Sequence, residues 1–206
     1  MKKKLYWQLP FLVFLIVGTV FIVRQQRSTP YQHDKGQVFG TFYHITYQND
    51  TSLNNDILAE LAKVDSALSM FNDKSIISRI NRGEDVKTTE MFDTVFNLAE
   101  NIADNTNGAF DITVAPLVNA WGFGFKTGNP PTKAAIDSLR SIVGYKKVAL
   151  RNNRITKTDP RVMLDCSAIA KGYGCDVVAH LLQRLGIENY MVEIGGEVVT
   201  HGISEK

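Results

Sequence analysis

A run of small residues at the start of a predicted helix is a candidate anion-binding site. It extends from Asp165 to Tyr173 and reads DCSAIAKGY. Backbone N–H groups at a helix N-terminus favour phosphate, Lys171 adds positive charge, and Asp165 can accept a hydrogen bond from a sugar or an amine. The run is not a P-loop, because G-x-x-x-x-G-K-[ST] is absent, and Gly195-Gly196 is no dinucleotide fingerprint. These residues alone fit a phosphate or nucleotide site or a simple helix start.

Two aromatic residues beside turn-forming residues could contact a planar ligand. Phe39 precedes Gly40, which could let a ring approach the backbone. Phe71 follows a predicted helix in SMFN and could stack on a ring system. The start of a strand explains the first cluster equally well, and capping with core packing explains the second.

A third segment is nearly free of charge. It reads GAFDITVAPLVNAWGFG from Gly108 to Gly124, and Asp111 is the only charged residue between Asp104 and Lys126. Such a carboxylate needs backbone donors, a cation or a ligand hydroxyl as a partner. Trp121 fits the core of the protein better than a ligand platform.

Helices and strands in alternation must position these residues. Apolar spacing and turn residues predict helices over 56–70, 75–81, 88–105, 132–142 and 172–185, and strands over 40–47, 147–150, 154–157, 162–164, 190–194 and 197–200. Beyond residue 27 the chain has 18 basic and 21 acidic residues. This mildly acidic body argues against a nucleic-acid-binding surface.

The N-terminus has the pattern of a membrane-directed segment. Lys2, Lys3 and Lys4 precede an uncharged stretch from Leu9 to Val23. We expect an uncleaved transmembrane anchor over residues 1–24, a polar tether over 25–36 and the folded domain over 37–206; a cleaved signal peptide is the alternative. The domain is then expected on the extracytoplasmic side of the inner (cytoplasmic) membrane. Cys166 and Cys175 are expected to be small buried residues rather than a disulfide.

Five segments together resemble a known family. They read GTFYHITY, LSMFNDKSIISRIN, GAFDITVAPLVNAWGFG, LDCSAIAKGYGCD and VEIGGEVVTHG, in this order between about Phe39 and Gly202. Their order and spacing resemble the FAD:protein FMN transferases, the ApbE flavin transferase family.

The resemblance implies a bilobed α+β enzyme that binds FAD between its lobes. Such an enzyme uses Mg²⁺, transfers FMN from FAD to a Thr or Ser hydroxyl of an exported target protein, and releases AMP. A subunit of a membrane redox complex is the kind of target that the resemblance suggests. An exported FAD-binding module and an FAD pyrophosphatase without protein transfer remain the alternative functions.

The resemblance also assigns residues to the site. The positions that match its FAD contacts are Phe39, Phe71, Ala109, Phe110, Asp111, Asp165 and Lys171. Ala168 matches a metal-binding position, where only its backbone carbonyl can serve. No catalytic residue is assigned, because the family's important His and its acidic and Thr metal ligands lie in later segments, and His201 is too early to match. The chain is therefore expected to be the front part of a longer protein, with an inactive remnant as the alternative.

Overall fold

An antiparallel sheet forms one half of the folded domain. The structure is a computed structural model that describes residues 10–20, 29–123 and 130–205. The sheet has the order β1-β2-β5-β6 and consists of β1 Tyr31–Val38, β2 Thr41–Gln48, β5 Tyr190–Ile194 and β6 Glu197–His201. Each neighbouring pair is antiparallel, and Tyr43 of β2 is paired with Ile194 of β5. Two hairpin turns, at 39–40 and 195–196, therefore lie at the same end of the sheet.

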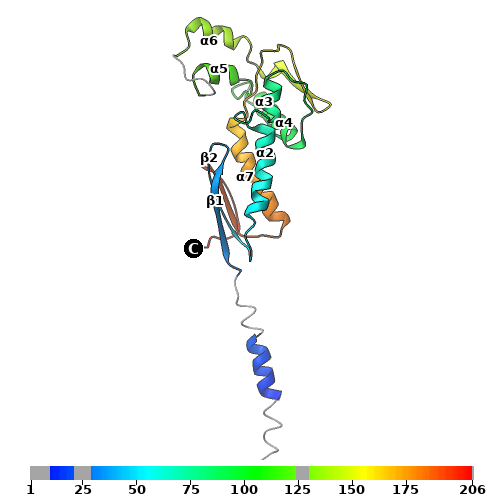
Figure 1. The fold of residues 1–206 in the computed structure, drawn as a ribbon, viewed down its shortest axis with the longest axis vertical. Coiled ribbons are helices and arrows are strands. Elements are labelled where there is room, and N and C mark those ends of the chain that lie inside the picture. Colours follow the sequence, from blue (N-terminus) through cyan, green and yellow to red (C-terminus); the bar gives the residue numbers. More distant parts are fainter. Residues whose placement is uncertain (1–9, 21–28, 124–129, 206) are drawn as a thin grey trace, which may run out of the picture.

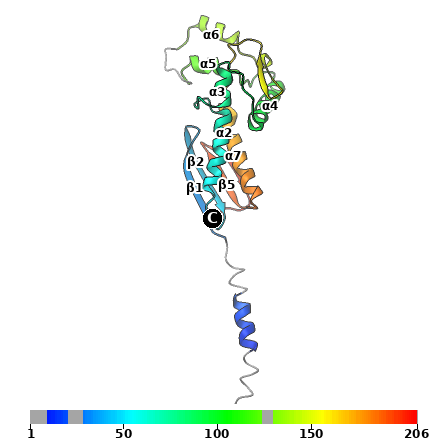
Figure 2. The ribbon, with the colours of Figure 1, turned by 45° about the vertical axis from the view of Figure 1, so that its right-hand side comes forward.

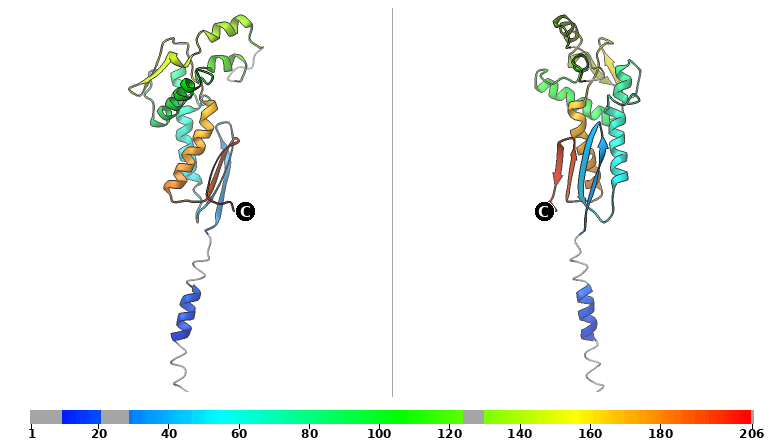
Figure 3. Two further views of the ribbon diagram at one scale, coloured as in Figure 1. Left: turned by 180° about the vertical axis from the view of Figure 1, so that it is seen from behind. Right: turned by 60° about the vertical axis from the view of Figure 1, so that its left-hand side comes forward.

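Two long helices cover one face of this sheet. They are α2 Asn54–Leu68 and α7 Ser167–Arg184, which lie side by side in every view (Figures 1 and 3). The alternation of β2 turns Tyr43, Ile45 and Tyr47 inward, where they are buried. Both helices extend past the end of the sheet that carries the two turns, as Figure 1 shows.

The remaining elements gather at the far ends of these two helices (Figure 2). They are α3 Ile76–Asn81, α4 Glu90–Asn105, α5 Ala115–Ala120, α6 Lys133–Arg140, the 3-10 helix Tyr145–Lys147 and the hairpin of β3 Val148–Arg151 with β4 Arg154–Lys157. Three of the helices begin with a side-chain cap. The hydroxyls of Ser75, Thr89 and Thr132 each accept a hydrogen bond from the backbone N–H three residues later. Asn152 and Asn153 both have positive φ, as the tight turn between β3 and β4 requires.

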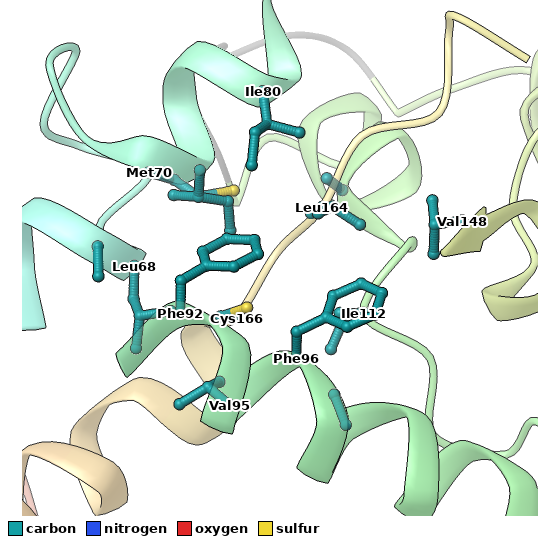
Figure 4. Packing of buried hydrophobic residues seen from close by; sticks show 14 of the residues in the cluster. Leu68, Met70, Ile80, Phe92, Val95, Phe96, Ile112, Val148, Leu164 and Cys166 are labelled. Atoms are coloured by element: carbon teal, nitrogen blue, oxygen red, sulfur yellow. The ribbon is translucent and has the colours of Figure 1, made fainter. Parts of the chain in front are cut away.

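The buried apolar residues form two cores. One core packs the inward face of the sheet against α2 and α7. The other lies among α2, α3, α4 and the segments around Ile112 and Leu164, with Phe92 stacked near Phe96 at its centre (Figure 4). Phe39 packs against both cores. This two-core arrangement of helices with an antiparallel sheet is the α+β class that the family resemblance implied.

Three predicted boundaries need correction. The prediction of a tether over 25–36 is wrong from Tyr31 onward, because Tyr31–Val38 forms strand β1. This strand is mostly polar, and its backbone pairs with β2 along its whole length. The helix predicted over 172–185 begins at Ser167, because its small first-turn residues are compatible with a helix. The strand predicted over 162–164 is reduced to one isolated bridge between Val114 and Met163.

Part of the predicted anchor can be described. Residues 10–20 are helical, and the other residues of the predicted 1–24 segment lie outside the described part of the chain. Within residues 10–20, 29–123 and 130–205, no helix is both long and apolar enough to cross a membrane.

The two cysteines are free and buried, as expected. Cys166 belongs to one core and Cys175 to the other. Burial raises the pKa of Cys166 to about 12 and that of Cys175 to about 11. Both therefore serve as small core residues rather than reactive thiolates at neutral pH.

Candidate functional site

Three of the predicted contact residues surround one cavity. Phe39, Phe71 and Lys171 line a cavity of about 160 Å³ whose remaining wall is formed by Val64, Leu68, Ser69, Met70, Ser167 and Ala170. A wider opening of about 450 Å³ shares Phe39 and Phe71 with it and extends toward Asn72 and Lys74. The cavity and its opening, which we call the Phe39 pocket, combine an apolar wall and Lys171 in the cavity with Lys74, Asp65 and Asp73 at the opening.

The turn between β1 and β2 places Phe39 in this pocket. Phe39 has φ of +52° and Gly40 has φ of +74°. A left-handed conformation is uncommon for a bulky residue, so the surroundings must hold it. One of these surroundings is Gly174 on α7, where an added Cβ would lie 2.8 Å from the Phe39 ring. The glycine lets the ring lie directly against the helix.

A hydrogen-bonded loop positions Phe71. The Asn72 side chain donates to Asp65 on α2 over 2.6 Å, and the Ser75 hydroxyl donates to the Ser69 carbonyl over 2.6 Å. Ser75 is completely buried, whereas Phe71 is 65% exposed. Ser75 is therefore the capping residue that the sequence allowed, and Asn72 ties the loop to α2. The loop holds an aromatic ring at the surface of the pocket.

The first turn of α7 forms another wall. Asp165 accepts a hydrogen bond from Ser167 N–H over 2.8 Å, and Ile169 and Ala170 N–H donate to the Cys166 carbonyl. Asp165 is buried and lines neither part of the Phe39 pocket. Its carboxylate shapes the helix start, and its contact with FAD stays a prediction.

Long-range hydrogen bonds join the separate motifs. The Asn81 side chain donates to the Leu164 carbonyl over 2.8 Å and accepts from Leu164 N–H over 2.7 Å. Asp165 N–H donates to the Ile112 carbonyl over 2.7 Å. These bonds bring the segments around 71–81, 109–112 and 164–171 into one region of the fold.

Asp111 holds its own loop together. One carboxylate oxygen accepts from Thr113 N–H and from the Thr113 hydroxyl, both over 2.7 Å. The other accepts from Tyr145 N–H over 2.8 Å. The partners that the Asp111 carboxylate needs are thus hydrogen-bond donors of the chain itself. Asp111 therefore has the structural role that the sequence left open beside ligand binding. Contacts of Ala109, Phe110 and Asp111 with FAD remain predictions.

Lys171 contacts a turn that sequence reasoning did not place in the site. Its ammonium donates to the Gly195 carbonyl over 3.1 Å and lies 3.6 Å from the Glu197 carboxylate. Gly-Gly between two apolar strands could identify this hairpin turn. Nothing in the residue pattern connects it with Lys171, because the two are joined only through the tertiary fold.

Glu100 on α4 has an unusual protonation equilibrium. Its Oε1 is buried and has no hydrogen-bond partner among the described residues. Burial, helped by the negative charges of Asp111 and Asp104, raises its pKa to about 7. Because the pKa is raised in the folded state, this carboxyl favours folding at low pH and loses that contribution as the pH rises through about 7.

We therefore expect Glu100→Gln to be more stable than the wild type above neutral pH. The variant cannot ionise, so its advantage should be larger at pH 8 than at pH 5. Urea unfolding at the two pH values measures this difference. An advantage that is equal at both would show that the carboxyl titrates normally in the folded protein.

A metal site is not complete in the described part of the chain. Within residues 10–20, 29–123 and 130–205 there is no group of three or more His, Cys, Asp or Glu side chains that could hold a metal ion. Ala168 is exposed in the first turn of α7, where its carbonyl could provide one ligand. These residues do not by themselves form the set of ligands that Mg²⁺ needs.

The fold and the Phe39 pocket define a two-core α+β protein with a partly apolar site beside the N-terminus of a helix. Comparison with known proteins identifies the family: residues 39–206 match the ApbE family, and the chain belongs to it. It is 37% identical to the FAD:protein FMN transferase of Vibrio cholerae over 84% of this chain and 55% of that protein. The FAD:protein FMN transferase of Haemophilus influenzae is also 37% identical, over 86% of this chain and 56% of its own length.

Solved structures show the same fold. The flavin transferase ApbE from Vibrio cholerae superimposes with a TM-score of 0.80 at 36% identity, covering 85% of this chain and 60% of that one. The apo flavinyl transferase ApbE of Pseudomonas stutzeri gives 0.78 at 28% identity, covering 85% and 62%. The chain thus spans little more than half the length of the curated relatives above.

Proposed function

We propose that this protein takes part in the transfer of FMN from FAD to a Thr or Ser hydroxyl of an exported target protein, with release of AMP. The observation that carries the proposal is the meeting of Phe39, Phe71 and Lys171 around one pocket. The names of the relatives, FAD:protein FMN transferases, support the choice of FAD as the ligand.

The chain's own residues offer binding and orientation. Phe39 and Phe71 provide aromatic surface for a ring system, and Met70 extends the apolar wall. Lys171 can attract a phosphate group, and the N-terminus of the 18-residue helix α7 adds its dipole. An anchored pyrophosphate would be held in a fixed position for attack by an acceptor hydroxyl.

We also propose that the reaction depends on Mg²⁺. The support is the resemblance at Ala168, whose carbonyl would be one ligand. In the proposed reaction the acceptor hydroxyl attacks the FAD pyrophosphate, and a divalent cation would neutralise the negative charge there.

An assay of both products tests this function. We would incubate the protein with FAD and Mg²⁺ and with membranes from cells that lack flavin transferase, as a source of acceptors. The expected result is free AMP together with flavin fluorescence that stays on a protein band after denaturing electrophoresis, both lost when EDTA removes Mg²⁺. AMP without bound flavin would indicate a pyrophosphatase, and FAD binding without AMP would indicate a binding module.

We propose further that residues 1–24 anchor the protein in the inner membrane, with the domain on the extracytoplasmic side. The uncharged stretch after Lys2, Lys3 and Lys4 supports this orientation. Replacing Leu15, Ile16 and Val17 by Asp should release the protein from membranes or block its export. A variant that still fractionates with membranes outside the cytoplasm would contradict the anchor.

A further inference from the structure

Glu197 is the counter-ion of the one cation that lines the inner cavity of the Phe39 pocket in the described structure. Its Oε1 lies 3.6 Å from the Lys171 ammonium, and the two side chains are 51% and 35% exposed. An ammonium has three donors, and the Gly195 carbonyl accepts one of them over 3.1 Å. A ligand anion that approaches Lys171 must therefore share the ammonium with a carboxylate of the protein.

The backbone that carries Glu197 is held firmly on both sides of the turn. Gly195 N–H donates to the Phe42 carbonyl over 2.9 Å, and Gly196 N–H donates to the Glu193 carboxylate over 2.7 Å. The Cys175 thiol donates to the Glu197 carbonyl over 3.3 Å. An added Cβ at Gly195 would lie 2.7 Å from Thr41 Cγ2, so the turn is packed against β2. The backbone of Glu197 is thus held in place, and its side chain extends from it to Lys171.

We propose that Glu197 competes with anionic ligands for Lys171 and so lowers their affinity for the Phe39 pocket. The inference rests on the proposed function only in taking FAD as the natural ligand. An ion pair as exposed as that of Lys171 and Glu197 is weak, so a ligand anion can displace the Glu197 carboxylate from Lys171. A small anion gains only interactions with charges and dipoles in the pocket, whereas a flavin nucleotide also gains contact with Phe39, Phe71 and Met70. Simple phosphates lack these aromatic contacts, so the competition leaves them the most weakly bound of the anions.

Binding of three probes to the full chain tests this role. FAD and inorganic pyrophosphate are anions, and riboflavin is a neutral flavin; all are titrated by calorimetry in metal-free buffer. Glu197→Gln should bind FAD and pyrophosphate about two- to five-fold more tightly than the wild type, the range of an exposed ion pair. Riboflavin binding should not change, and high salt should reduce the gain.

Three variants separate this role from a general effect of charge or structure. Glu197→Asp keeps the charge and should behave nearly as the wild type. Glu84→Gln removes a carboxylate that is paired with Arg79 and Arg82 and does not line the Phe39 pocket, so it should leave all three affinities unchanged. In a Lys171→Met background, Glu197→Gln should give a clearly smaller gain.

Equal or weaker binding of FAD and pyrophosphate by Glu197→Gln, including no binding of either, would overturn the inference. A wild type that binds pyrophosphate but no flavin would instead refute the proposed function. In that case the pyrophosphate measurements alone still decide the role of Glu197.

Discussion

Phe71→Ala is expected to weaken FAD binding strongly while barely changing the stability of the protein. Stacking of a base on an aromatic side chain contributes about 1–3 kcal/mol, which corresponds to a loss of about five- to 150-fold in affinity. Phe71 is 65% exposed, and hydrogen bonds of Asn72 and Ser75 hold the loop that carries it. An exposed substitution of this kind usually changes the free energy of unfolding by less than about 0.5 kcal/mol.

Calorimetric titration with FAD and urea unfolding measure the two effects of this change. Phe42→Ala is a matched control, because Phe42 is 60% exposed and lies outside the Phe39 pocket. The control should retain FAD affinity. If Phe71→Ala and Phe42→Ala bind FAD equally well, the ring does not contact the ligand.

Gly174→Ala and Gly172→Ala, two residues apart on α7, are expected to have opposite effects on stability. Ala is favoured over Gly inside a helix by about 1 kcal/mol, and a Cβ at Gly172 meets no atom within 4 Å. Gly172→Ala should therefore stabilise the protein by about that amount. A Cβ at Gly174 would lie 2.8 Å from the Phe39 ring and 3.4 Å from Ile194 Cδ1, so this variant should lose about 1–3 kcal/mol through overpacking.

Moving the Phe39 ring should also disturb the pocket. We expect Gly174→Ala to bind FAD more weakly, and Gly172→Ala to bind it as the wild type does. Urea unfolding of both variants, repeated in a Phe39→Ala background, isolates the contact. The cost of Gly174→Ala should become much smaller once the ring is removed, and an unchanged cost would mean that the clash lies elsewhere.

The local part of the fold could be predicted from the residues. Thr89 and Thr132 are strong N-cap residues, and helices begin directly after them. Asn152-Asn153 and Gly195-Gly196 both form two-residue turns with positive φ, as their composition indicates. β1 was missed because its polar residues resemble a tether, and only its pairing with β2 reveals a strand.

The site could be predicted only in part. Residue type marks Phe39, Phe71 and Lys171 as candidates, the family resemblance assigns them to FAD, and the fold brings them together from three separate segments. The bonds that join these segments, such as Asn81 to Leu164, connect residues 83 positions apart. Asp111 illustrates the reverse case: its isolation in an uncharged segment correctly predicted a partner, but not that Thr113 and Tyr145 would provide it.

Amide hydrogen exchange with and without FAD is the most direct test that the Phe39 pocket binds the flavin nucleotide. Mass spectrometry of the full chain would report exchange segment by segment. We expect FAD to slow exchange in residues 69–75, 166–171 and 194–197, and to leave β3 and β4 unchanged. Binding of FAD with no change in these three segments, or with protection elsewhere only, would contradict the assignment of the site.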